Sequence, residues 1–313
     1  MNLKKNKILI LGASGFLGRN FCKKLVDKKI NFHSLNRKDC DLTDYKKLYK
    51  ILNQIKPDIV FNFAGKVGGI HYNITKPAEI ISNNIRISIN VFEALSSIGA
   101  KKLVNIGSSC SYPDLNNSIL SEKMLFKGNL HQSIEAYGFW KLFNIVAAKA
   151  YKKEKQLDSI NIIFPALYGP LHDFEGKNSH VMASLISRFV ECKKKNLRSI
   201  TCWGNGRPIR EFLYIDDAIE AILLTASKYN KIEPLNIGEG KGYTIKYIAE
   251  LIKELTSFDG KIIWDKSKPN GVMKKILNTG KMKKVLKWQP NTNIKQGIKH
   301  TLEWYLKSKK FVK

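Results

Sequence analysis

The sequence has few cysteines, and no two of them are spaced as a pair. Its 313 residues include five cysteines, and no two form a C-x-x-C motif. An odd number of unpaired cysteines predicts neither a disulfide framework nor a zinc site, so we expect no metal. We expect Cys22, Cys40, Cys192 and Cys202 to be small buried side chains. Cys110 is the exception, because of the segment in which it lies.

Long apolar runs are also missing. No run in the sequence approaches the ~18 residues that a membrane-spanning helix needs. The apolar run Ile8–Leu11 near the N-terminus is too short for the apolar core of a signal peptide. We therefore expect a cytoplasmic protein that does not bind membranes.

Arginine and acidic residues are scarce relative to lysine. The 54 basic residues comprise 47 Lys and 7 Arg, against 26 acidic residues, which gives a formal net charge of +28. Recognition of nucleic acids usually depends on arginine. Lysines spread along the whole chain instead predict a solvated surface, which would still attract anionic small molecules such as nucleotides. We expect no nucleic-acid partner.

The N-terminal segment combines a strand, a glycine turn and a helix. A strand is predicted at Lys7–Leu11, and the turn that follows has the spacing G-x-x-G-x-x-G. In this context the motif indicates dinucleotide binding. Gly12 makes the turn, Gly15 lets the backbone approach the pyrophosphate, and Gly18 permits close packing of the helix. The residues of this turn expected at the cofactor are Gly12, Ser14, Gly15, Phe16, Leu17 and Gly18.

The second predicted strand, residues 31–35, ends at Asn36, and Arg37 follows. An NAD-specific site usually has a carboxylate here for the ribose 2′-hydroxyl, whereas an arginine suits a 2′-phosphate. We therefore predict NADPH as the cofactor. Asp41 and Leu42 lie in the next loop, where we expect the adenine.

A further strand, Asp58–Gly65, leads into the glycine-containing segment Lys66–Ile70. Ala64 and Gly65 are expected to lie against the cofactor, and Ile80–Ile98 is predicted as a helix. Strands and helices alternate to this point. This order predicts an α/β fold with a Rossmann-type doubly wound parallel sheet.

A strand at Lys102–Ile106 runs into Gly107–Pro113, which places the hydroxyl of a serine near the thiol of Cys110. The next helix carries Tyr137 and Lys141, which lie on one helix face because they are four residues apart. An ammonium group beside a phenol should lower the pKa of Tyr137. Such a tyrosine could deliver a proton to a ketone oxygen.

With these motifs, the chain resembles the extended short-chain dehydrogenase/reductase superfamily. More narrowly, it resembles the GDP-L-fucose synthase family of GDP-4-keto-6-deoxymannose 3,5-epimerase/4-reductases. The resemblance covers nearly the whole chain in the family's order. Besides the segments above, it depends on Leu167–Pro170, Asn178–Val181, Trp203–Phe212 and Ser267–Gly271.

The resemblance implies a catalytic set. Ser108 would hydrogen-bond the C4 carbonyl of the sugar, Tyr137 would be the general acid, and Lys141 would hold the nicotinamide ribose. Cys110 and His180 would exchange protons at C3 and C5. No role is expected for the other histidines, including His172, which are taken as surface residues.

The resemblance also implies binding residues, domains and a partner. An NADP-binding Rossmann domain would span residues 1–165, with segments near 212–240 returning to it, and a smaller α/β substrate domain would span 166–313. A homodimer would form through helices near 81–95 and 137–151. Further cofactor contacts would come from Ile106, Ser108, Lys141, Phe164, Leu167 and His180, and contacts to GDP from Arg188, Trp203, Arg210 and Asn270.

Three departures from the family pattern concern the substrate. Ala166 and Asn270 replace a usual Asn and Asp, and Val272–Lys274 replaces Thr-Pro-Arg. One alternative is therefore a C4-reductase of a GDP-4-keto-6-deoxy-heptose, with little or no epimerase activity, in the synthesis of capsule or lipopolysaccharide. The other alternative, from a different functional class, is a non-catalytic NADP(H)-binding protein.

Overall fold

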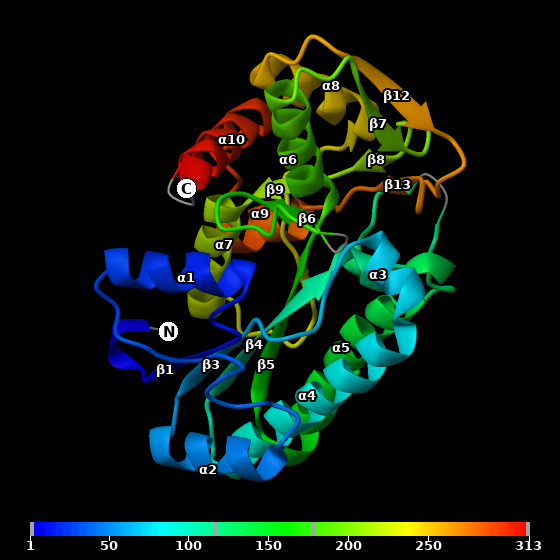
Figure 1. Cartoon of the computed structure of the whole chain (residues 1–313). Helices are drawn as coiled ribbons and strands as arrows, with labels where there is room; N and C mark the ends of the chain where they lie inside the picture. The colour runs from blue at the N-terminus through cyan, green and yellow to red at the C-terminus, as the bar shows by residue number, and fades with distance from the viewer. Residues whose placement is uncertain (1–2, 116–117, 177–178, 311–313) are drawn as a thin grey trace.

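The computed structural model describes residues 3–115, 118–176 and 179–310. Its largest element is a six-stranded parallel sheet with the strand order β10-β5-β4-β3-β1-β2 (Figure 1). The strands are β1 (Ile8–Leu11), β2 (His33–Leu35), β3 (Ile59–Asn62), β4 (Lys102–Ser108), β5 (Asp158–Phe164) and β10 (Leu235–Asn236). The order reverses direction between β1 and β3. In such sheets this point opens a crevice at the carboxyl ends of the strands, where ligands bind.

Helices cover both faces of this sheet (Figure 1). One face carries α2 (Tyr45–Ile55), α4 (Pro77–Ser97), which follows the short α3 (Ile70–Thr75), and α5 (Glu135–Lys155). The opposite face carries α1 (Phe16–Asp27) and α7 (Ile215–Lys228). The inner strands β1 and β3 are buried on both sides because both faces are covered. In β1, for example, Ile8 and Ile10 pack into one layer, and Leu9 and Leu11 into the other.

Three small sheets, ordered β11-β8-β13, β12-β7 and β6-β9, lie beyond the carboxyl ends of β4 and β5 (Figure 1). Their strands are β6 (Ala166–Tyr168), β7 (Ser199–Trp203), β8 (Ile209–Arg210), β9 (Phe212–Tyr214), β11 (Tyr243–Thr244), β12 (Lys261–Asp265) and β13 (Lys274–Lys275). The helices of this part are α6 (Val181–Lys194), α8 (Ile245–Thr256), α9 (Gly280–Leu286) and α10 (Ile294–Lys310). Short 3-10 helices are η1 (Leu3–Lys5), η2 (Ser109–Ser111), η3 (Glu122–Met124) and η4 (Gln132–Ile134).

The α/β fold with a doubly wound parallel sheet, predicted from the alternation of strands and helices, is confirmed. The helix expected at Ile80–Ile98 is α4. The helix α6 begins at Val181, and Asn178 of the Asn178–Val181 motif lies outside the described residues. Over the described ranges, no helix is both long and apolar enough to cross a membrane.

Candidate active site

The end of β4 presents a hydroxyl and a thiol on one turn. Ser108 caps η2, and its Oγ accepts a hydrogen bond from the backbone N–H of Cys110 at 3.2 Å. The Oγ of Ser111 donates to the carbonyl oxygen of Ser108 at 2.7 Å. These two side-chain-to-backbone bonds fix the turn and with it the positions of Ser108 and Cys110 relative to each other.

The helix α5 brings Tyr137 and Lys141 to this turn. A Cβ atom at Gly138 would lie 2.4 Å from the carbonyl oxygen of Cys110, so only glycine allows α5 to approach η2 this closely. The Nζ of Lys141 donates to the carbonyl oxygen of Ile106 at 2.7 Å and lies 3.6 Å from the ring centroid of Trp140. The same Nζ lies 5.5 Å from the ring centroid of Tyr137. The hydroxyl of Ser108 also interacts with Tyr137, so the three predicted residues converge.

The ionisation of this pair differs from the expectation. Burial raises the pKa of Tyr137, and the charge of Cys110 adds to this effect, while the hydrogen bond with Ser108 opposes it. Burial lowers the pKa of Lys141 to about 7, against the attraction of Cys110. The prediction that Lys141 lowers the pKa of Tyr137 is therefore wrong for this structure. The ammonium contacts Ile106 and Trp140 rather than the phenol oxygen, and burial dominates.

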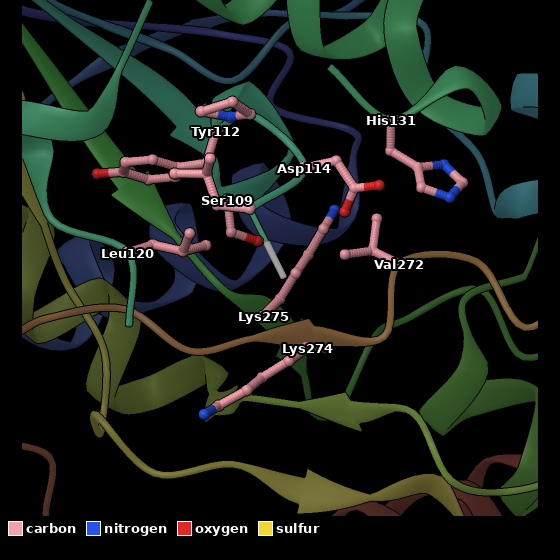
Figure 2. A pocket seen from close by; sticks show the side chains of 10 residues that line it. Ser109, Tyr112, Asp114, Leu120, His131, Val272, Lys274 and Lys275 are labelled. Atoms are coloured by element: carbon pink, nitrogen blue, oxygen red, sulfur yellow. The ribbon is translucent and has the colours of Figure 1, made fainter. Parts of the chain in front are cut away.

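Cys110 has a cationic neighbour that the sequence did not indicate. The Nζ of Lys275 lies 3.2 Å from its Sγ. Burial disfavours the thiolate, but Lys275, Ser108 and Arg210 outweigh it, so the pKa of Cys110 is lowered. Lys275 points toward the segment from Ser109 to Asp114 across a small cavity of about 10 Å³ (Figure 2). A cavity of this size holds about one water molecule.

His180 precedes α6 and faces a second histidine. The ring of His172 lies 5.3 Å from that of His180, at 83° to it, and 4.4 Å from the ring of Phe16 in the glycine turn. The surrounding protein lowers the pKa of His180, and His172 lowers it further. His172 is buried, so its assignment as a surface residue is wrong. His180 therefore packs on His172, which in turn packs on the glycine turn, whereas Cys110 contacts Lys275.

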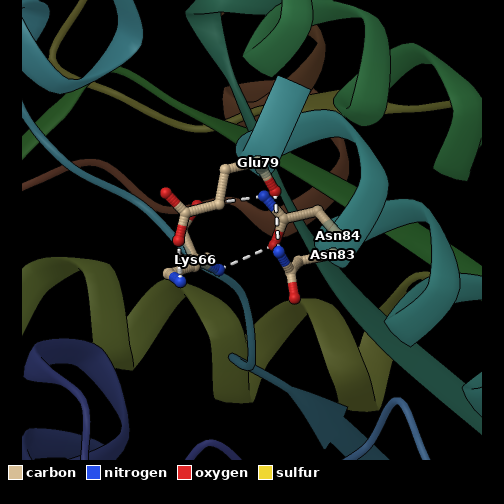
Figure 3. A network of polar contacts seen from close by, with 4 residues as sticks. All are labelled: Lys66, Glu79, Asn83 and Asn84. Carbon is tan, nitrogen blue, oxygen red and sulfur yellow. Dashed lines mark hydrogen bonds and ion pairs between the residues drawn. The ribbon is translucent and has the colours of Figure 1, made fainter. Parts of the chain in front are cut away.

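The loop after β3 is held by side chains of α4 (Figure 3). Buried Asn84 binds both backbone groups of Lys66, accepting from its N–H at 2.6 Å and donating to its carbonyl oxygen at 2.9 Å. Lys66 also forms an ion pair with Glu79, whose carbonyl oxygen accepts from Asn83 at 2.9 Å. This network fixes the loop that begins with Ala64 and Gly65.

The predicted GDP contacts lie around the small sheets. Trp203 is 47% exposed, which rules out a role in core packing. Arg188 donates to the carbonyl oxygen of Thr201. The side chain of Asn270 accepts from the N–H of Asn205 at 3.0 Å.

Arg210 lies between this region and the catalytic turn. Its guanidinium donates to the carbonyl oxygens of Ile209 at 3.0 Å and Asn270 at 3.5 Å. Burial lowers the pKa of Arg210 to about 10, although Cys110 favours the charged form. Arg210 therefore links the predicted GDP contacts to the catalytic turn.

Comparisons with known proteins agree with this geometry. A profile of the NAD dependent epimerase/dehydratase family matches residues 8–238. The chain belongs to this family. GDP-L-fucose synthase 1 of Arabidopsis thaliana is 36% identical over 309 residues, which cover 98% of this chain and 95% of the relative. The resemblance to the GDP-L-fucose synthase family is therefore confirmed.

Two solved structures share the whole fold. A GDP-6-OMe-4-keto-L-xylo-heptose reductase from C. jejuni has a TM-score of 0.91 at 25% identity, with 98% of this chain and 99% of that chain covered. A GDP-mannoheptose C4 reductase from Campylobacter jejuni, with NADP bound, has a TM-score of 0.87 at 26% identity and the same coverage. Both names describe reductases of GDP-heptoses.

In this member of the epimerase/dehydratase family, the glycine turn fits a dinucleotide. Gly12 has φ +77°, and a Cβ there would lie 2.6 Å from the backbone nitrogen of Ala64. A Cβ at Gly18 would lie 2.2 Å from the carbonyl oxygen of Gly12. At Gly15, however, a Cβ would meet only the carbonyl oxygen of Gly12, at the ordinary contact distance of 3.4 Å. No acidic residue and no capping side chain occupies the start of α1, which leaves its N–H groups available for a phosphate.

The other predicted cofactor residues differ in exposure. Arg37 is exposed beyond β2, close enough to Asp41 to help to lower the pKa of that carboxyl, which the Thr43 backbone and hydroxyl lower most. Leu42 is buried. Ser14 is exposed in the turn, Ile106 and Leu167 are half-buried, and Phe164 is buried at the end of β5.

Sequence reasoning missed Lys275, His172 and the positioning residues Asn84 and Trp140. Lys275 follows the segment in which the chain departs from the family pattern, and this was the one available signal. Asn84 bonds to the backbone of Lys66, and the indole N–H of Trp140 donates to the hydroxyl of Ser88 at 2.8 Å, and no local sequence pattern indicates either bond. Each acts through a contact between segments far apart in the sequence.

Proposed function

We propose that this protein uses NADPH to reduce the C4 ketone of a GDP-4-keto-6-deoxy sugar and also epimerises the sugar at C3 and C5, as a GDP-L-fucose synthase does. The observation that supports this most directly is the convergence of Ser108, Tyr137 and Lys141 beside a thiol of lowered pKa. A protein that only bound the cofactor would need neither the phenol nor the thiol.

In the reduction, Ser108 and Tyr137 are proposed to donate hydrogen bonds to the carbonyl oxygen, and Tyr137 transfers its proton to it. The raised pKa of Tyr137 keeps the phenol protonated until then, as a proton donor requires. When bound, NADPH supplies the hydride. The turn Gly12–Gly18 would hold its pyrophosphate, Arg37 its 2′-phosphate, and Lys141 its nicotinamide ribose.

In the epimerisation, Cys110 and His180 are proposed to act on carbons next to the same ketone. Protons there are acidic because the negative charge moves to the carbonyl oxygen, where Ser108 and Tyr137 stabilise the enolate. Inverting a centre requires removal of a proton on one face and return on the other, and therefore two groups. The lowered pKa of Cys110 favours the thiolate, and the lowered pKa of His180 favours the neutral imidazole, so each can accept a proton near pH 7.

The small sheets are proposed to hold the GDP. The exposed face of Trp203 offers a stacking surface, and Arg210 suits a diphosphate because its guanidinium can form two parallel hydrogen bonds. Arg188 and Asn270 would complete this substrate domain, residues 166–313, beside a cofactor domain of residues 1–165 and a returning segment near 212–240. We also propose a cytoplasmic homodimer that pairs α4 and α5 of two copies.

A second candidate is a C4-reductase of a GDP-4-keto-6-deoxy-heptose with little epimerase activity. The overall similarity to two solved GDP-heptose reductases supports it, as do Ala166 and Asn270, which alter polar contacts near the predicted substrate site. In this case Cys110 and His180 would be present without exchanging protons.

Turnover in deuterated water tests these proposals. The purified protein is given NADPH and GDP-4-keto-6-deoxymannose, and the product is analysed by mass spectrometry and NMR. We expect deuterium at C3 and C5, and its loss in Cys110→Ser. Reduction without deuterium at either carbon would favour the reductase, with a heptose substrate as the next comparison. Tight NADPH binding without turnover of any GDP-4-keto sugar would favour a non-catalytic protein.

A further inference from the structure

Lys275 contacts Cys110, and Arg210, on the same small sheet, acts on it through its charge. β13 pairs with β8 in parallel, and the register places Lys275 directly opposite Arg210. Residues paired in this way point to the same face of a sheet. The Nζ of Lys275 lies 3.2 Å from Sγ of Cys110, which is 165 residues away in the sequence.

The backbone of β13 is held on both sides. On one side, the N–H groups of Ile209 and Glu211 donate to the carbonyl oxygens of Met273 and Lys275 at 2.8 and 3.1 Å. On the other, the N–H of Leu120 donates to the carbonyl oxygen of Ile276 at 2.8 Å. Lys275 is therefore placed over Cys110 by rigid backbone contacts rather than by a loop.

The charges around the thiol are one-sided. In the part of the chain that the structure describes, neither Lys275 nor Arg210 forms an ion pair with a carboxylate. Together with Lys141 on α5, three basic side chains thus act on one thiol. Asp114 lines the same cavity as Lys275, but among the described residues the two form no ion pair. A thiolate next to cations and accepting hydrogen bonds is favoured over the thiol.

We propose that Lys275 is the positioning residue that keeps Cys110 in the thiolate form and so makes it a base at neutral pH. This rests on the proposed epimerisation. When Cys110 takes a proton from a carbon next to the ketone, the C–H bond breaks, an S–H bond forms, and the electron pair moves into the enolate. Lys275 is not the base in this step. Its ammonium stabilises the thiolate before the step and is free to hydrogen-bond the substrate after it.

The pH dependence of alkylation of Cys110 tests this without any substrate. Cys110 is half-buried, and mass spectrometry of the peptide that contains it separates its alkylation by iodoacetamide from that of the other four cysteines. In Lys275→Met we expect the midpoint of the alkylation profile to rise by at least about one pH unit, equal to about tenfold slower labelling below it. Lys275→Arg should stay close to the unmodified protein, because it restores the charge.

Lys274→Met is the matched control, since Lys274 lies on the same strand and its side chain points the other way in Figure 2. Its profile should not change. Circular dichroism and NADPH binding check the fold of each variant, and Lys275→Gln replaces Lys275→Met if the latter does not fold. An unchanged profile in the folded neutral variant would overturn the proposal, and a raised KM for the GDP-sugar alone would then make Lys275 a substrate contact. Because alkylation needs no GDP-sugar, it gives an answer even where the deuterium experiment refutes epimerisation.

Discussion

Replacing Lys141 by methionine should stabilise the protein at neutral pH, although it removes a residue of the proposed catalytic set. Lys141 is 7% exposed, and burial lowers its pKa from 10.5 to about 7. The folded state therefore binds fewer protons than the unfolded state between these two pH values. Stability must rise with pH through that window, and below it the full cost of burying the charge is present.

The size of the effect follows from the shift. One pKa unit corresponds to about 1.4 kcal/mol, so the cost is about 5 kcal/mol below pH 7 and falls to about 1 kcal/mol near pH 9.5. Methionine loses the hydrogen bond to Ile106, which costs about 1 kcal/mol. Lys141→Met should thus gain about 4 kcal/mol of unfolding free energy near pH 6.5 and about nothing near pH 9.5.

Urea unfolding of both proteins at the two pH values measures this. At each pH the unfolding free energy of the unmodified protein is subtracted from that of the variant. The change in this difference between the two pH values is the result, because the contributions of other titrating groups cancel. Lys153→Met is the control, because Lys153 is exposed on the same helix, and its difference should not depend on pH. If Lys141→Met shows the same pH dependence as the unmodified protein, the burial argument is refuted. Loss of reductase activity in the same variant would show that Lys141 is needed for function although its burial destabilises the fold.

Three further outcomes are expected. Gly138→Ala should lower turnover at least about tenfold, because the added Cβ would lie 2.4 Å from the carbonyl oxygen of Cys110 and push α5 from η2. Gly280→Ala, whose nearest neighbour is a side chain at 3.2 Å, should be neutral, and steady-state kinetics of both variants decide. Arg37→Ala should raise KM for NADPH at least about tenfold and leave that for NADH nearly unchanged; equal use of both cofactors by the unmodified protein would disprove the role of Arg37. His172→Asn should raise the pKa of His180, because His172 lowers it, and an unchanged imidazole titration by NMR would show that the two rings are not coupled.

The features that could be predicted from the sequence are those in which a short segment carries its own geometry. The alternation of strands and helices fixed the parallel sheet, and the spacing of Gly12 and Gly18 matches two backbone contacts that no Cβ could occupy. Tyr137 and Lys141 share a helix face for the same local reason. Ser108, Tyr137 and Lys141 come together through the packing of a single strand, β4, and a single helix, α5.

The features that could not be predicted depend on long-range pairing and on burial. β13 is two residues long, too short for any periodic pattern, yet its register decides which side chain meets Cys110. The predicted direction of the pKa shift of Tyr137 was wrong because the sequence shows the neighbouring charge of Lys141 but not the loss of water around the phenol. His172 was misjudged for the same reason, since nothing in its local sequence shows that it packs between Phe16 and His180.

The charges of the cleft also bear on what it binds. Lys141, Arg210 and Lys275 surround Cys110, and burial lowers the pKa of the first two. Such a site is far from electrically balanced, because a single thiolate cannot neutralise three cations. A diphosphate next to Arg210 would supply negative charge and so favour the ammonium form of Lys141. An uncharged sugar would not change this balance, so we expect the charge of the nucleotide, as well as its shape, to contribute to substrate binding.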